Sequence, residues 1–97
     1  MINKLSDNEI EEKIKTLNEG LVQSWIIKNS KLYKSFAFND FVIAFEFMTK
    51  VAEIAEDVNH HPNWSNIYNK VDIYLTTHEV KGISERDFDM AALIEKL

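Results

Sequence analysis

The segment from Asn39 to Val58 constrains the fold of this chain most strongly. An N-cap residue opens it, and apolar residues then recur three and four positions apart, which is the spacing of one helical face. That face consists of Phe41, Ala44, Phe45, Met48, Val51, Ala52 and Ala55. Because Ile43, Phe47 and Ile54 lie outside it, the helix is apolar over more of its circumference than one sheet can cover. We therefore expect a second buried contact along this helix.

Two shorter helices are predicted near the ends of the chain. Residues 6–9 have the Ser-x-x-Glu spacing of a capping box and precede a helical apolar stripe, which indicates a helix over residues 7–18 that ends at Gly20. Residues 84–87 have a similar Ser-x-x-Asp spacing. The helical stripe that follows it consists of Met90, Leu93, Ile94 and Leu97.

Four short segments rich in aromatic and β-branched residues are predicted to be strands. Val22–Ile27 and Leu32–Phe38 are separated by a polar, turn-like segment, and Trp64–Tyr68 and Val71–Thr77 are joined by two residues. Apolar and polar residues alternate in the last segment, as in a strand with one buried face. Connections of this length favour antiparallel pairing within each pair of strands.

The order of these elements is helix, strand, strand, helix, strand, strand, helix. It predicts an α+β fold in which a four-stranded antiparallel sheet carries three helices packed on one face. The chain has 97 residues with two Gly and one Pro, and no segment has the composition of a linker. We therefore expect residues 1–97 to form a single domain.

Composition argues against several function classes. The absence of Cys leaves no disulfide framework and no thiolate metal site, and the polar first residues lack the apolar core of a signal peptide, so a cytoplasmic location is expected. Sixteen acidic and eleven basic residues give a formal charge of −5, which opposes direct binding to nucleic acid. No apolar run reaches the roughly 18 residues that span a bilayer, so no membrane insertion is expected.

All three histidines of the chain lie between residues 56 and 87. His60 and His61 directly follow the long helix, and His78 follows the last predicted strand. Imidazole, with an unperturbed pKa of about 6.5, can donate or accept a proton near neutral pH. Three imidazoles at the ends of elements therefore suggest acid–base chemistry, provided that the fold brings them together.

Fixed intervals separate the polar residues of this region. Glu56 is followed after three residues by His60-His61-Pro62, after five more by Tyr68, after nine more by His78 and after eight more by Asp87. This pattern resembles the signature of the pterin-4a-carbinolamine dehydratases. Segments around Asp40-Phe41, Tyr68-Asn69-Lys70-Val71 and Thr77-His78-Glu79 are also similar to segments of that family. The resemblance extends from about Ser6 to the end of the chain.

The resemblance implies an activity. Members of this family remove water from 4a-hydroxytetrahydropterin, the carbinolamine that aromatic amino acid hydroxylases leave, and form quinonoid dihydropterin in tetrahydrobiopterin recycling. It implies that His60, His61 and His78 transfer the protons, without a metal ion or an organic cofactor. The pterin-contacting positions that it implies are Asn59, His60, His61, Thr76, Thr77, His78 and Glu79.

Supporting roles are implied for Glu56 and Asp87, which would orient imidazoles, and for Trp25, which would lie near the site. Simpler interpretations stay open, since Glu56 also fits an exposed helix residue and Asp87 a capping carboxylate. The His60-His61 pair alone would be typical of a helix C-terminus, where the helix dipole favours cations. A three-histidine zinc site fits less well, because adjacent ligands suit it poorly and no His pair has an i, i+4 spacing.

A non-catalytic interpretation also stays open. By resemblance, some family members serve as dimerisation partners of a homeodomain transcription factor, and relatives without the histidines act as assembly factors. A hydroxylase or transcription-factor partner is thus implied besides the pterin substrate. A homodimer or homotetramer is implied as well, and the apolar excess of Ile43, Phe47 and Ile54 indicates residues 40–58 as the contact. The presence of all three histidines favours the enzyme over a scaffold.

Overall fold

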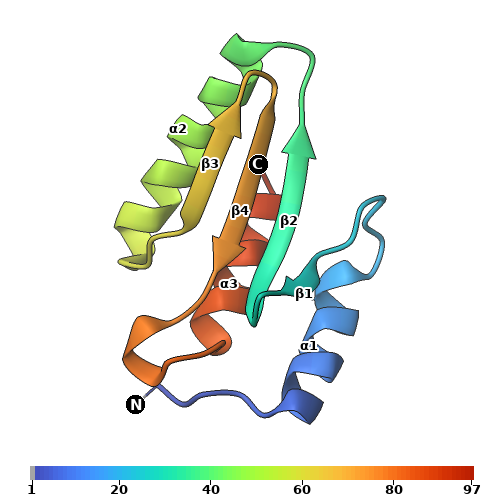
Figure 1. Ribbon diagram of the computed structural model, residues 1–97, viewed down its shortest axis with the longest axis vertical. Coiled ribbons are helices and arrows are strands. Elements are labelled where there is room, and N and C mark those ends of the chain that lie inside the picture. Colours follow the sequence, from blue (N-terminus) through green and yellow to red (C-terminus); the bar gives the residue numbers. More distant parts are fainter. Residues whose placement is uncertain (1) are drawn as a thin grey trace.

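The predicted order of elements is confirmed in a computed structural model, which describes residues 2–97. A four-stranded antiparallel sheet with strand order β1-β2-β4-β3 carries three helices on one face (Figure 1). The elements are α1 (Asp7–Asn18), β1 (Ile26–Lys28), β2 (Lys31–Ala37), α2 (Phe41–Val58), β3 (Asn63–Ile67), β4 (Lys70–Leu75), the short 3-10 helix η1 (His78–Val80) and α3 (Glu85–Glu95). The central strands are β2 and β4.

Tight turns close both hairpins. Asn29 and Ser30, between β1 and β2, have φ angles of 53° and 60°, the left-handed conformation that a type I′ turn requires at both positions. Tyr68, between β3 and β4, has a φ of 51°. The strands β2, β3 and β4 begin and end within two residues of their predicted bounds.

The first strand is the exception, because β1 begins at Ile26 and not at the predicted residue 22. The side-chain amide of Asn18 binds the backbone of Trp25 twice, accepting from its N–H at 2.8 Å and donating to its carbonyl at 3.0 Å. These backbone groups are therefore unavailable to a strand. Val22 is fully exposed, so the segment before Trp25 forms an outer loop and not the edge of the sheet.

The core lies between the sheet and the helices. Alternate residues of β2 and β4 point into it, which fits the period of a strand with one buried face. The buried apolar residues are Trp25, Leu32, Ala44, Val51, Ala55, Val71, Ile73, Leu75, Ile83, Phe88, Met90, Ala91 and Ile94. Leu93 and Leu97, predicted on the buried stripe of α3, are 36% and 51% exposed. The last helix thus turns a narrower part of that stripe towards the core.

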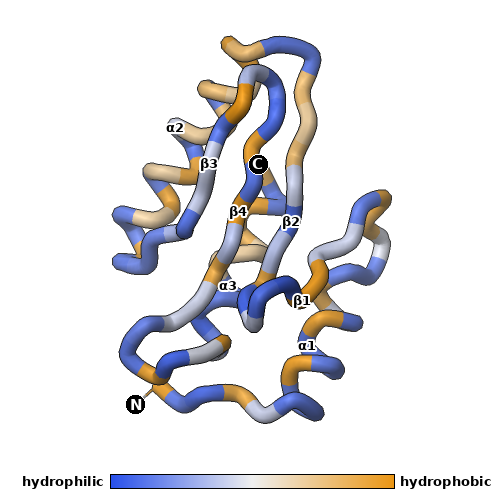
Figure 2. Tube along the Cα trace, in the orientation of Figure 1, coloured by the Kyte–Doolittle hydropathy of each residue, from blue (hydrophilic) through white to orange (hydrophobic). Residues whose placement is uncertain are grey.

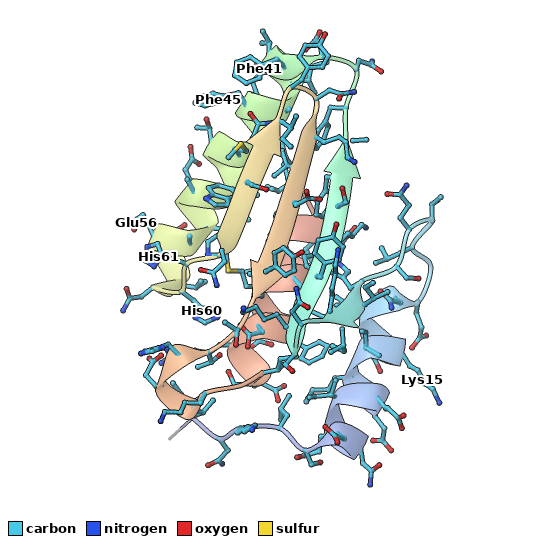
Figure 3. The ribbon with its side chains drawn as sticks, in the orientation of Figure 1. Lys15, Phe41, Phe45, Glu56, His60 and His61 are labelled. Atoms are coloured by element: carbon cyan, nitrogen blue, oxygen red, sulfur yellow. The ribbon has the colours of Figure 1, made fainter. Side chains whose placement is uncertain are left out.

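α2 buries only part of the face that its apolar spacing predicts, and the buried residues of that face are Ala44, Val51 and Ala55. Phe41 and Phe45, assigned to the buried face, are 45% and 56% exposed and lie near the N-terminal end of the helix (Figure 3). Phe47, assigned to the outside, packs its ring against those of Phe36 and Phe38, with ring centroids 4.8 and 4.9 Å apart. The prediction that Phe47 lies outside the buried face is therefore wrong, because its ring packs against Phe36 of β2 and against Phe38, which directly follows that strand.

Apolar residues nevertheless remain on the outside of α2. Figure 2 shows apolar residues along most of this helix, including its N-terminal end. Ile54 packs against the core, contrary to its predicted outer position. The exposed apolar residues of the N-terminal half, here called the outer apolar face, are Phe41, Val42, Ile43 and Phe45. Although α2 has 18 residues, no helix within residues 2–97 is long and apolar enough to cross a membrane.

Candidate active site

A buried carboxylate joins the segments that carry the predicted site residues. Asp87 lies in the first turn of α3 and is completely buried. Its Oδ2 accepts hydrogen bonds from the N–H of Ser84 and the hydroxyl of Thr77, both at 2.9 Å. Its Oδ1 lies 2.6 Å from Nε2 of His60. Asp87 thus connects the start of α3 with the end of β4 and with the segment after α2.

The backbone after α2 directs the His60 ring towards α3. Asn59 has left-handed angles, φ 52° and ψ 47°, and the N–H of His60 donates to the carbonyl of Ala55 at 3.0 Å. This is the Schellman type of helix ending, with Asn at the position that Gly usually occupies. After this reversal the His60 side chain lies against α3 and is only 8% exposed.

His60 also lines a small hollow beside α3. The hollow has a volume of about 210 Å³ and is lined by Val58, His60, Arg86, Asp89 and Met90. Within residues 2–97, Nδ1 of His60 makes no hydrogen bond and is not fully buried. His60 can therefore exchange a proton with a bound molecule through Nδ1 while Nε2 stays on Asp87.

His61 contacts a different carboxylate. Its Nε2 lies 2.6 Å from Oε2 of Glu56, which lies five residues earlier, in the last part of α2. Figure 3 shows the two side chains together at the C-terminal end of the helix. They are 57% and 77% exposed, so water competes with their contact. Glu56 therefore lies beside His61 and not beside His60. Because their contact is exposed, Glu56 restrains the ring of His61 less than Asp87 restrains the ring of His60.

β4 ends in a short loop that carries His78. The N–H of Thr77 and the hydroxyl of Thr76 both donate to the carbonyl of Gly82, at 2.8 and 3.2 Å, and so close the loop. His78 is exposed at the start of η1. Because Thr77 also binds Asp87, the backbone of His78 is only one residue away from the buried carboxylate.

The structure brings only some of the predicted residues into direct contact. The network of Asp87 includes His60 and the residue before His78, whereas His61 is held apart from it by Glu56. Within the described chain no hydrogen bond joins two imidazoles, and neither His61 nor His78 lines the hollow beside His60. In the single chain, two of the three imidazoles thus lie on an open surface.

Trp25 is a core residue in this structure. It is 1% exposed, its ring meets that of Phe36 edge-on with centroids 5.8 Å apart, and its Nε1 donates to Glu95 at 2.9 Å. Lys34 binds the same carboxylate oxygen at 2.6 Å. None of these contacts involves a histidine, and a role for Trp25 near the site stays a prediction.

Sequence reasoning missed two contributors to the site. Ser84 was predicted only as a helix cap, but its hydroxyl also lies 2.6 Å from that of Thr77. Arg86 lines the hollow, and its Nη1 lies 3.6 Å from a carboxylate oxygen of Glu79 on η1. The capping-box spacing pointed to Ser84, whereas no sequence pattern marks Arg86. Over residues 2–97, no three His, Cys, Asp or Glu side chains are placed to hold a metal ion together.

The fold and the site define a class: a two-layer α+β protein with a histidine–carboxylate pair where α2, β4 and α3 meet. A family model described as pterin 4 alpha carbinolamine dehydratase matches residues 3–97. This chain therefore belongs to the pterin-4-alpha-carbinolamine dehydratase family.

Individual relatives match over nearly their whole length. A protein of Solibacter usitatus (strain Ellin6076), named as a candidate pterin-4-alpha-carbinolamine dehydratase, is 42% identical over 97 residues, which is all of this chain and 97% of the relative. A protein of the same name from Christiangramia forsetii is 40% identical over 97 residues, covering 95% of the relative. A Brucella melitensis crystal structure, described as a transcriptional coactivator/pterin dehydratase, has a TM-score of 0.87 and 36% identity and covers 97% of each chain.

Proposed function

We propose that this chain dehydrates 4a-hydroxytetrahydropterin to quinonoid dihydropterin, with His60, His61 and His78 transferring the protons. The observation that carries this proposal is the contact between His60 and the buried carboxylate of Asp87. A carboxylate that holds one nitrogen of an imidazole leaves the other nitrogen free for acid–base work. Membership of the family supports the substrate class.

The reaction needs an acid and a base. The bond between C4a and its hydroxyl oxygen breaks, and the oxygen takes a proton from the acid and leaves as water. N5 gives its proton to the base, and its electron pair forms the new double bond to C4a, so no net proton is consumed. Hydroxide alone would be a poor leaving group because water has a pKa of about 15.7. Each well-placed imidazole contributes roughly 10²- to 10⁴-fold to such a step.

The pterin is proposed to bind between residues 59–61 and residues 76–79. The hydroxyls of Thr76 and Thr77 already donate hydrogen bonds inside the protein, to Gly82 and Asp87. Contact with the substrate from this strand end therefore falls to backbone groups and to the exposed side chains of the two residues that follow. Fixed backbone donors and acceptors suit a flat heterocycle, which must be held in one orientation.

A stopped-flow experiment tests this function. Freshly made 4a-hydroxytetrahydropterin is mixed with the protein, and its decay is followed by ultraviolet absorbance, with and without a metal chelator. We expect the decay to accelerate in proportion to protein concentration and to be insensitive to the chelator. A decay rate equal to that of buffer alone would refute the dehydratase activity, and a loss of rate with the chelator would refute the metal-free mechanism.

A second function is favoured by the outer apolar face of α2. Phe41, Val42 and Phe45 are 45%, 66% and 56% exposed, which is unusual for neighbouring large apolar residues on a protein surface. We propose that this face binds a second copy of the chain and gives the homodimer or homotetramer. The Brucella melitensis neighbour is described as a transcriptional coactivator as well as a pterin dehydratase. A hydroxylase or transcription-factor partner would compete for the same face.

A further inference from the structure

We infer that the hydroxyls of Thr77 and Ser84 are positioning groups that hold Asp87 as an ionised acceptor and thereby fix the tautomer of His60, with the proton on Nε2 and Nδ1 left free. The catalytic consequence of this inference rests on the proposed function. The tautomer itself is a property of the free protein and can be measured without substrate.

The donors around Asp87 support the ionised form. Its Oδ2 accepts from the N–H of Ser84 and the hydroxyl of Thr77, both at 2.9 Å, and Oδ1 lies 2.6 Å from Nε2 of His60. An ionised carboxylate is an acceptor at both oxygens, so it matches three donors. Such charge-assisted hydrogen bonds are also stronger than neutral ones. All three contacts are satisfied when the imidazole proton is on Nε2.

The two hydroxyls form a chain with one consistent direction. Thr77 has a single hydroxyl proton, which it donates to Asp87. The contact of 2.6 Å between the two hydroxyls must then use the proton of Ser84, whose oxygen in turn accepts from the N–H of Arg86 at 3.2 Å. Every donor of the chain is thus directed towards the carboxylate. Ser84 and Thr77 are completely buried, so water does not replace a missing member.

The position of Asp87 at the start of α3 also favours its ionised form. Asp87 lies at the third position of the helix, where the unpaired N–H groups and the helix dipole favour a negative charge. The competing arrangement has a neutral Asp87 that donates from Oδ1 to an unprotonated Nε2, with the His60 proton on Nδ1. That arrangement gives up the charge that the helix terminus and the two donors on Oδ2 stabilise.

The fixed tautomer determines how His60 works. With Nε2 donating to Asp87, the ring can take a proton only at Nδ1, and the adjacent carboxylate stabilises the imidazolium that forms. Nδ1 is the ring nitrogen that has no partner among residues 2–97 and is not fully buried. Thr77 and Ser84 therefore influence the proton transfer without touching the substrate through their hydroxyls.

Nuclear magnetic resonance of the ¹⁵N-labelled protein tests the inference, because the imidazole nitrogen shifts distinguish the two neutral tautomers. The informative variant is Thr77→Val, which removes the hydroxyl at nearly constant volume. Thr77→Ser retains the hydroxyl and should restore the wild-type tautomer of His60. Thr76→Val is the matched control, since the hydroxyl of Thr76 donates to Gly82 and not to Asp87.

We expect the neutral His60 ring of the wild-type protein to carry its proton on Nε2. In Thr77→Val the Nδ1–H form should become populated, and kcat should fall roughly 10-fold or more with KM little changed. Thr77→Ser should restore the wild-type spectrum and rate, and Thr76→Val should keep the wild-type spectrum. If Thr77→Val does not fold, Ser84→Ala takes its place, and the wild-type spectrum decides the tautomer in any case.

Two results would overturn the inference: a wild-type His60 protonated on Nδ1, or a folded Thr77→Val protein with an unchanged tautomer and kcat. The expected tautomer and its shift in Thr77→Val, together with no dehydration by the wild-type protein, would support the positioning network and refute the proposed function instead. The wrong tautomer in a protein that dehydrates the carbinolamine would refute the positioning network alone.

Discussion

Nε2 of His60 lies 2.6 Å from Oδ1 of Asp87, although 27 residues separate the two along the chain. These side chains are 8% and 0% exposed, whereas His61 and Glu56, at the same distance, are 57% and 77% exposed. The electrostatic coupling of the buried pair is stronger, because water and salt screen the exposed one. The two histidines should therefore respond differently when their carboxylate partners are changed.

Replacement of the buried carboxylate, Asp87, should strongly lower the dehydration rate. We expect Asp87→Asn to lower kcat by roughly 10²-fold or more, because the amide can donate to Nε2 of His60 and then favours the wrong tautomer. The measurement is the rate of carbinolamine decay at saturating substrate. Circular dichroism serves as the control for folding. A folded variant with the wild-type rate would show that the pair has only a structural role.

Replacement of the exposed carboxylate, Glu56, should change the dehydration rate only slightly. We expect Glu56→Gln to change the rate by less than about fivefold, since an exposed ion pair contributes only about 0 to 1 kcal/mol. His61→Ala, in contrast, should slow the reaction by roughly 10²-fold if this imidazole transfers a proton. A Glu56→Gln defect as large as that of His61→Ala would mean that the contact tightens when substrate binds.

Self-association should depend on the outer apolar face of α2. We expect Phe45→Glu to lower the molar mass measured by light scattering, because it places a charge on a side chain that is 56% exposed and lies next to Phe41. Thr49→Glu, on the exposed side of the next turn, is a control for added charge alone. An unchanged mass for Phe45→Glu would exclude this face as the contact.

The inner side of the same helix should affect stability instead. Phe47→Ala removes a ring that packs against Phe36 and Phe38, and we expect it to lower the free energy of unfolding by roughly 2 to 4 kcal/mol. Urea denaturation of the variant measures this loss. If the variant is as stable as the wild-type protein but forms a smaller oligomer, Phe47 lies in the contact between copies instead.

The environment of Tyr33 predicts that the folded protein loses stability at alkaline pH. Burial, and then the hydrogen bond to Asp72 at 3.0 Å, raise the pKa of Tyr33 above its ordinary value of 10.0. Because the folded protein holds this proton more tightly than the unfolded chain, the stabilisation is complete below about pH 10 and disappears as the pH rises through the higher pKa. An ultraviolet titration should show a late-ionising tyrosine that is missing from Tyr33→Phe. A difference between the two titration curves with its midpoint at or below pH 10 would contradict this environment for the phenol.

Sequence patterns such as capping boxes predicted the helices and strands, because these patterns depend on interactions between residues close together in the chain. Both capping boxes, Ser6 with Glu9 and Ser84 with Asp87, form as their spacing indicates. The buried face of α2 was predicted only in part, because the burial of its aromatic residues depends on a distant partner. Its apolar residues surround most of the helix, and the rings of Phe36 and Phe38 explain why Phe47, and not Phe45, packs against the core.

The sequence named candidate residues for the site but did not indicate which of them pair with each other. Asp87 and Glu56 were both expected near imidazoles, but their partners could not be assigned, because His60 and His61 are adjacent and follow a residue in the left-handed conformation. That conformation of Asn59 turns the first ring towards α3 and leaves the second beside α2. The roles of the three histidines stay predictions that only kinetics can test.

The most direct test removes all three imidazoles at once. The variant His60→Ala/His61→Ala/His78→Ala is compared with the wild-type protein in the stopped-flow decay of freshly made 4a-hydroxytetrahydropterin, after circular dichroism has shown that both are folded. We expect rapid decay with the wild-type protein and the buffer rate with the variant. Equal acceleration by both proteins would contradict proton transfer by the three histidines.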